Sequence, residues 1–147
     1  DPYFLELQGQ VMLESGKPAD AIPPLREAVQ RTNGEPLIAA MLGHALVATE
    51  DDSHLDEAER VLRNTVARDR QNPFAWYSLG VVYQRKGDTA CAALATAERY
   101  SMEGQDALAL RHADVALAGI QPNSPDYLRA QDIAMASRAA MERTRKK

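Results

Sequence analysis

Three histidines and one cysteine are the residues of this chain best suited to chemistry. Imidazole is the commonest transition-metal ligand and general base, but His44, His54 and His112 share no metal-ligand spacing. No two of them stand four residues apart, and no His-Glu-x-x-His motif is present. Cys91 has no histidine near it in sequence and is expected to be a small buried side chain. The sequence therefore predicts no catalytic residues, no metal site and no cofactor.

A run of carboxylates surrounds the second histidine. Its members are Glu50, Asp51, Asp52, Asp56, Glu57 and Glu59. Carboxylates suit calcium, but this run lacks the glycine-centred spacing of a calcium-binding loop. It is therefore predicted to be a solvated turn between two helices.

The composition indicates packed helices. Hydrophobic residues make up 45% of the 147 residues, charged residues 26% and aromatic residues only 5%, which is ordinary for a globular domain. Alternating β-branched and aromatic residues, the mark of strands, are absent. No apolar run approaches the roughly 18 residues that a membrane-spanning helix needs.

Charge is distributed unevenly along the chain. Residues 1–72 hold 7 basic and 13 acidic side chains, whereas residues 73–147 hold 10 and 8. No basic stripe interleaved with aromatic residues is present, so nucleic acid is not an expected partner. A single cysteine cannot form an internal disulfide, which leaves the redox compartment open. Because the sequence starts at Asp1 without an initiator methionine or signal peptide, it is expected to be an excised piece or a mature fragment.

Self-comparison reveals an internal repeat. The segments 7–9, 41–43 and 78–80 each end in glycine, and these glycines are 34 and then 37 residues apart. The three additional residues fall in the polar segment 50–54, where an insertion costs little. A period of about 34 residues is typical of a helix–turn–helix repeat.

The third repeat carries the fullest set of repeat positions. These are Trp76, Leu79, Gly80, Tyr83, Gly87 and Ala92. On this pattern the chain resembles the tetratricopeptide repeat (TPR) family over nearly its whole length. The resemblance implies an all-α fold, a right-handed superhelical stack of antiparallel helix hairpins with about 3.5–4 repeats and a C-terminal capping helix.

The repeat divides the chain into units of one predicted domain, 1–147. Repeats are expected at 2–34, 36–71, 73–103 and 88–121, so that 88–103 belongs to two of them, with the capping helix at 124–144. Helices are predicted at 2–15, 18–32, 36–49, 54–69, 73–86, 88–103, 105–119 and 124–144. Proline after a capping residue marks several of their starts, whereas Pro23 and Pro24 inside the second helix predict a kink or a separate turn.

Small residues are expected where the two helices of a hairpin approach closely. The first helices present Gly9, Gly43 and Gly80, and the second helices present Ala21, Ala58 and Ala92. A larger side chain in these contacts would overpack them, at about 1–3 kcal/mol for each position.

In the TPR family the first helix of each hairpin lines a concave face, so its positions imply a groove for a partner segment. The residues carried over by register for partner contact are Tyr3, Glu6, Gln10, His44, Phe74, Tyr77, Gln84 and Arg85. The same register adds Leu13, Leu37, Ala40, Val47, Val81, Leu94, Glu98 and Met102. The alternative is that the apolar members are covered by neighbouring helices or by another domain. The family's carboxylate clamp has no match, because Ser78 stands where asparagine is typical, so an acidic chaperone C-terminus is not an expected ligand.

A narrower resemblance rests on the order of several segments. They are 1–10 (starting Asp-Pro-Tyr-Phe), 21–25, 94–98 and 127–133. Their order is similar to the C-terminal domain of periplasmic zinc metallopeptidases of the β-barrel-assembly-enhancing protease (BepA-like) type. The resemblance implies a periplasmic, non-catalytic domain that recruits substrates or partners, with an upstream protease domain and outer-membrane assembly components as partners. The alternatives are a stand-alone TPR adaptor or chaperone and, least favoured, an enzyme in its own right.

Overall fold

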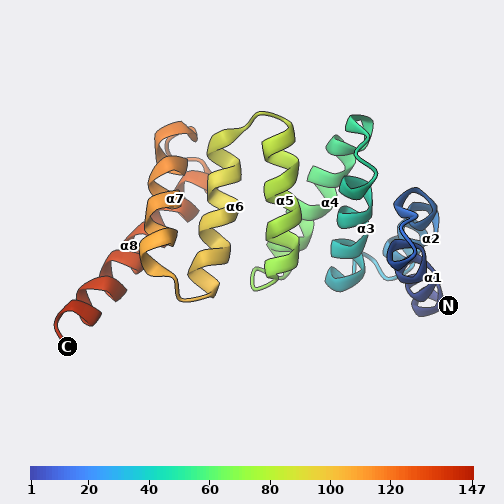
Figure 1. Ribbon diagram of the computed structural model, residues 1–147, viewed down its shortest axis with the longest axis horizontal. Helices are drawn as coiled ribbons and strands as arrows, with labels where there is room; N and C mark the ends of the chain where they lie inside the picture. Colours follow the sequence, from blue (N-terminus) through green and yellow to red (C-terminus); the bar gives the residue numbers. More distant parts are fainter. The chain divides into compact units, whose positions relative to one another are not determined.

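The computed structural model describes all residues 1–147 as eight α-helices and one 3-10 turn, with no strand (Figure 1). The helices are α1 (Pro2–Glu14), α2 (Pro18–Arg31), α3 (Pro36–Ala48), α4 (Leu55–Arg68), α5 (Pro73–Arg85), α6 (Thr89–Met102), α7 (Asp106–Gly119) and α8 (Pro125–Arg145), with η1 (Asp52–His54) before α4. Their bounds lie within two residues of those predicted, and the predicted all-α class is confirmed. Two compact units make up the chain, unit 1 (1–82) and unit 2 (83–147).

Capping side chains start the helices that proline was predicted to mark. Oδ1 of Asp1 accepts the Tyr3 N–H at 2.9 Å, and Oδ1 of Asn72 accepts that of Ala75 at 3.0 Å. Ser124 caps α8 in the same way. Each contact satisfies one of the backbone donors that a helix start leaves free.

Glycine ends two first helices in the left-handed region. Gly16 has φ +75° and Gly87 has φ +78°, a conformation that costs glycine little because it has no Cβ. Each glycine allows the chain to turn back into the second helix of its hairpin.

Unit 1 is built from consecutive helices that pack on one another, α1 on α2, α2 on α3 and α3 on α4, and α1 also touches α3. Its largest fully buried side chains from α2, α3 and α4 are Leu25, Ile38, Leu42, Leu46, Leu62 and Thr65. Branched apolar side chains therefore fill the space between these four helices.

The close approach within the unit 1 hairpins differs from the expected pairing. A Cβ added at Gly9 would lie 2.4 Å from Cγ of Leu25, and one at Gly43 would lie 2.4 Å from Cδ2 of Leu62. The nearest atoms therefore belong to a leucine one turn after the expected alanine, although Ala21 and Ala58 are themselves fully buried. Because glycine has no side chain, a large leucine fits against it. The sequence had predicted that a small residue would face another small residue.

Helix α2 runs unbroken through Pro23 and Pro24. The alternative of a separate turn at 18–22 is therefore wrong. The prolines are the sixth and seventh residues of the helix, and the carbonyls they leave without a donor belong to Ala19 and Asp20, both exposed. Solvent can satisfy those carbonyls, which lowers the cost of interior proline.

Polar contacts also join the second helices of unit 1. Arg26 on α2 forms a bidentate pair with Glu57 on α4, with N···O distances of 3.0 and 2.8 Å. This hydrogen bond is the main reason that the pKa of Glu57 is lowered and that of Arg26 raised. The guanidinium of Arg68 donates to the carbonyls of Asn33 and Gly34, just after α2.

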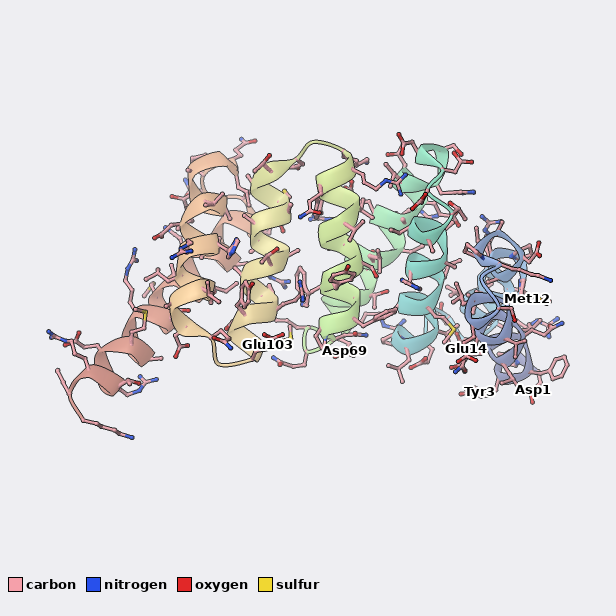
Figure 2. All side chains as sticks on the ribbon, viewed as in Figure 1. Asp1, Tyr3, Met12, Glu14, Asp69 and Glu103 are labelled. Atoms are coloured by element: carbon pink, nitrogen blue, oxygen red, sulfur yellow. The ribbon has the colours of Figure 1, made fainter.

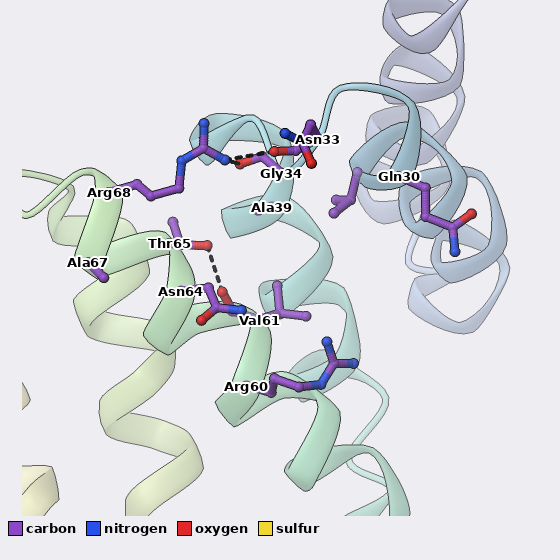
Figure 3. Close-up of a pocket in the computed structure, with 11 residues that line it drawn as sticks. Gln30, Asn33, Gly34, Ala39, Arg60, Val61, Asn64, Thr65, Ala67 and Arg68 are labelled. Carbon is purple, nitrogen blue, oxygen red and sulfur yellow. Dashed lines mark hydrogen bonds between the residues drawn. The ribbon is translucent and has the colours of Figure 1, made fainter.

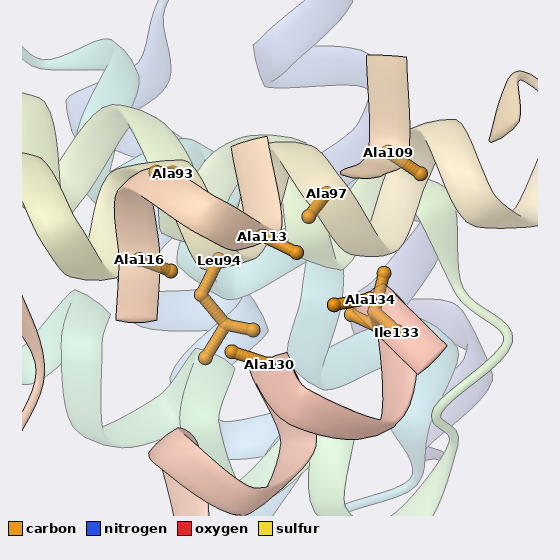
Figure 4. Packing of buried hydrophobic residues seen from close by; sticks show 9 residues of the cluster. All are labelled: Ala93, Leu94, Ala97, Ala109, Ala113, Ala116, Ala130, Ile133 and Ala134. Carbon is orange, nitrogen blue, oxygen red and sulfur yellow. The ribbon is translucent and has the colours of Figure 1, made fainter. Parts of the chain in front are cut away.

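Unit 2 packs α6, α7 and α8 against one another around small side chains (Figure 4). Its buried cluster contains Ala93, Leu94, Ala97, Ala109, Ala113, Ala116, Ala130, Ile133 and Ala134. Methyl groups in place of larger side chains let the three helices approach closely.

Two residues carried over as groove positions are in fact buried in unit 2. Leu94 belongs to the alanine cluster, and Glu98 is 3% exposed with its carboxylate 3.5 Å from the Arg129 guanidinium. Their assignment to a groove is wrong because α8 supplies Ala130 and Arg129 to the face of α6 on which they stand. An ion pair compensates for the buried charge of Glu98.

Candidate functional site

A groove of about 430 Å³ lies in unit 1, between α1, α3 and the start of α5. It is lined by Glu6, Gln10, Leu13 and Glu14 of α1, Leu37, Ala40, Met41 and His44 of α3, and Asn72 and Phe74. Figure 2 shows Glu14 on the side of α1 that faces α3. The residues from each helix recur every three or four positions, so they form one face of it.

The centre of the groove is apolar and aromatic. The rings of His44 and Phe74 lie 5.1 Å apart, tilted by 51°. Burial lowers the pKa of His44, because desolvation disfavours the imidazolium. His44 therefore faces the groove at neutral pH as a neutral, partly apolar ring.

The α1 wall of the groove is acidic. Glu6 and Glu14 lie on it, with Gln10 between them donating from Nε2 to Oε1 of Glu14 at 3.1 Å. No lysine or arginine lines the groove. The charged side chains that line the groove are therefore all negative.

Asn72 contributes a polar group at the base of the groove. Its Oδ1 accepts the Ala75 N–H, and this contact fixes the orientation of the side-chain amide. Its Nδ2 is buried and has no hydrogen-bond partner. Buried donors are usually satisfied, so this amide is an exception.

Comparison with known proteins gives information on the fold. No protein-family model matches the chain, and no curated protein matches its sequence. Among solved structures, the crystal structure of MamA, a TPR-like helical protein, matches with a TM-score of 0.66 and 21% sequence identity, over 100% of this chain and 82% of that one. The chain has a TPR-type helical repeat fold. Nothing in these comparisons supports the narrower resemblance to metallopeptidase C-terminal domains.

The TPR register brings part of the predicted contact set together. Glu6, Gln10, His44 and Phe74 line the unit 1 groove, as do Leu13, Leu37 and Ala40. Tyr3 and Tyr77 are exposed but do not line it. Contact of any of these residues with a partner stays a prediction.

Three lining residues, Glu14, Met41 and Asn72, were not among the predicted groove positions. Glu14 stands four residues after Gln10, and Met41 four residues after Leu37, so helical periodicity could have found both. Asn72 stands before Pro73 in a pattern typical of a helix cap, and no sequence signal reveals that its side chain also lines a groove.

A separate pocket of about 350 Å³ lies in unit 2. It is lined by Gln84, Thr89, Ala92, Ala93, Thr96, His112 and Val115. The ring of His112 stacks on Tyr100 at 5.4 Å, and burial together with neighbouring Arg111 lowers its pKa. Gln84, predicted as a groove residue, lines this pocket and not the unit 1 groove, and the partly exposed Arg85 lines neither.

A further hollow of unit 1, about 600 Å³, is lined by α2, the turn after α2, Ala39 of α3, and α4 (Figure 3). Some of its polar groups are engaged by the protein itself. Arg68 binds the carbonyls of Asn33 and Gly34, and the hydroxyl of Thr65 donates to the Val61 carbonyl at 2.8 Å.

The titratable side chains of the chain form no group of three or more His, Cys, Asp or Glu that could hold a metal ion. Cys91 takes part in no disulfide and is half-buried, whereas a buried side chain was expected. None of the helices is long and apolar enough to cross a membrane.

Proposed function

We propose that this chain is a non-catalytic protein-interaction domain that binds a segment of a partner protein in the unit 1 groove. The observation that carries the proposal is the groove itself. Its lining combines apolar side chains of α1, α3 and α5 with carboxylates of α1, and α3 is itself anchored by buried Leu42 and Leu46. Such a pre-formed site loses little ordering entropy on the scaffold side when a segment binds.

Site-specific photo-crosslinking in cells tests this proposal. A photoreactive amino acid is placed at Leu37 in the groove or, as a control, at Met135 on α8, because the two side chains are equally exposed at 65% and 67%. We expect a discrete crosslinked product from position 37 and none of that size from position 135. Equal products from both positions, or none from position 37, would count against a binding groove.

Sequence resemblance supports a narrower context, in which the domain recruits substrates for a periplasmic zinc metallopeptidase acting on outer-membrane proteins. The resemblance rests on the order of the segments 1–10, 21–25, 94–98 and 127–133. A stand-alone adaptor or chaperone is the alternative, and the TPR-type fold is compatible with both.

The native protein distinguishes the two contexts. An antibody raised against the 16.1 kDa chain is used to blot periplasmic and other cell fractions and to test the precipitate for proteolysis. A periplasmic band several times larger, with chelator-sensitive proteolysis, would support the metallopeptidase. A band of the chain's own size without proteolysis would leave the adaptor.

A further inference from the structure

The charge of the unit 1 groove is the feature that restricts its partner. Glu6 and Glu14 lie on its α1 wall, and no basic side chain lines it. The whole of unit 1 also carries six more acidic than basic side chains. An approaching cationic segment is therefore attracted both at long range and in the groove.

The two carboxylates have a defined spacing. They stand eight residues apart on α1, which corresponds to about 12 Å along the helix axis at 1.5 Å per residue. Gln10 occupies one oxygen of Glu14, which leaves the other for a ligand. Opposite this wall the groove is lined by Leu37, Met41 and Phe74.

Asn72, which also lines the groove, holds a donor that the protein does not satisfy. Its side chain is 8% exposed, and its Nδ2 has no acceptor in the protein. Reversal of the amide would bring NH₂ against the Ala75 N–H, so the donor cannot be removed by a flip. Because this nitrogen has almost no accessible surface, a carbonyl oxygen of a bound peptide accepts from it only when the Asn72 side chain turns toward the groove.

We propose that the unit 1 groove takes a basic segment of a partner protein, with aliphatic or aromatic side chains on the groove floor and two lysines or arginines about 12 Å apart on Glu6 and Glu14. An extended segment spans about this distance between cations that stand four residues apart (i and i+4), at about 3.3 Å per residue. The inference rests on the proposed binding function and adds the chemical class of the partner.

Fluorescence anisotropy with designed peptides tests the proposal. The probe is a labelled 12-residue peptide of leucine, phenylalanine and lysine with the lysines four residues apart. Two further peptides carry glutamine or glutamate in place of every lysine. We expect the lysine peptide to bind about five- to tenfold more tightly than the glutamine peptide at low salt, and to lose most of that advantage at 0.5 M salt.

Variants of the whole chain locate the effect. Glu6→Gln with Glu14→Gln should remove the preference for lysine and leave binding of the glutamine peptide unchanged. The matched control is Asp20→Asn with Glu103→Gln, which changes the net charge equally at exposed positions outside the groove. Asn72→Ser keeps a capping oxygen but removes the donor, and should weaken all three peptides by about two- to fivefold.

The outcomes separate this inference from the binding function. If all three peptides bind equally and Leu37→Glu abolishes binding, the groove binds segments but not by charge, and only the present inference fails. If none binds, both proposals fail for this class of ligand. If the Asp20/Glu103 control loses the preference for lysine as fully as the Glu6/Glu14 variant does, the attraction comes from net charge alone. That result would overturn the role of Glu6 and Glu14. Self-association that Leu37→Glu blocks, without peptide binding, would make a second copy the occupant and overturn the proposal.

Discussion

Units 1 and 2 solve the same problem, close packing of short helices, in two different ways. In unit 1 a glycine on the first helix faces a leucine on the second, as in the pairs Gly9–Leu25 and Gly43–Leu62. In unit 2 alanines meet around Leu94 and Ile133. A single large side chain therefore fills the contact in unit 1, whereas methyl groups share it in unit 2.

The consequences extend to the surface. In unit 1, α1 and α3 barely touch each other, and an acidic groove lies between them. In unit 2, α8 packs on both α6 and α7 and buries Leu94 and Glu98. Unit 1 holds the acidic excess of the chain, and residues 83–147 hold 10 basic and 8 acidic side chains. Unit 1 is thus the more open for binding, and the core of unit 2 is the less tolerant of larger side chains.

The largest expected effect comes from breaking the glycine–leucine contact of unit 1. Leu62→Ala should lower the free energy of unfolding by about 2–5 kcal/mol, because it removes a fully buried side chain and leaves a cavity. Urea denaturation followed by fluorescence reports on this unit, since the only tryptophan, Trp76, lies in unit 1 and is buried.

A double-mutant cycle sharpens that test. Gly43→Ala alone should destabilise, since its Cβ would lie 2.4 Å from Leu62 and overpacking outweighs the gain in helix propensity of about 1 kcal/mol. Combined with Leu62→Ala, the same change should be neutral or favourable, giving a coupling of at least about 1 kcal/mol. Additive effects would mean that Gly43 and Leu62 do not share their space.

The alanine cluster of unit 2 predicts the next largest effect. Ala113→Leu places a large side chain at a fully buried position and should destabilise by about 1–3 kcal/mol. Hydrogen exchange should rise in α6, α7 and α8. Ala118→Leu, an exposed position on the same helix, is the matched control and should leave exchange unchanged. Equal tolerance of both variants would contradict the tight packing of this unit.

Loss of the Arg26–Glu57 ion pair of unit 1 should lower the free energy of unfolding by a smaller amount. The alanine cluster of unit 2 contains no such ion pair. Glu57→Gln should cost at most about 1 kcal/mol, since both side chains are partly exposed. The pKa of Glu57 is lowered in the folded state, so the stabilisation is complete above the unfolded pKa and is lost as pH falls through the folded pKa. The gap in urea midpoint between wild type and variant should therefore close on acidification. A gap that persists when Glu57 is protonated would show that the charge is not its source.

Much of this fold can be predicted from the sequence, because its signals are local. Glycines at a regular spacing, proline after a capping residue and helical periodicity placed all eight helices to within two residues. The contacts between helices could be predicted less well from the sequence. Gly43 contacts Leu62 rather than Ala58. Which residues meet depends on their positions along the two helix axes and on the direction of their side chains, as well as on side-chain size.

The repeat register predicted the groove residues on α1 and α3 better than the groove positions later in the chain. Glu6, Gln10, His44 and Phe74 follow the repeat register and meet in the structure. Leu94 and Glu98 follow the same register but are buried, because a later helix, α8, packs against their face. No property of residues 88–103 reveals that cover, since it comes from residues more than thirty positions further along the chain.

The smallest effects expected are those of the two partly buried histidines, one in each unit. The pKa of both His44 and His112 is lowered by burial, so each should titrate below about 6.5, the ordinary value, in a two-dimensional NMR titration of the imidazole resonances. The unfolded chain then binds protons that the folded chain does not, so stability falls as pH drops through the window between the unfolded and folded pKa values. In His112→Phe that decrease should be reduced, with Arg111 retained to keep the local charge. His44→Phe should reduce it likewise while preserving the ring contact with Phe74. A midpoint at or above the ordinary value for His44 alone would mean that the unit 1 groove is wetter than its packing indicates, and that the contrast in openness between the two units is larger than described.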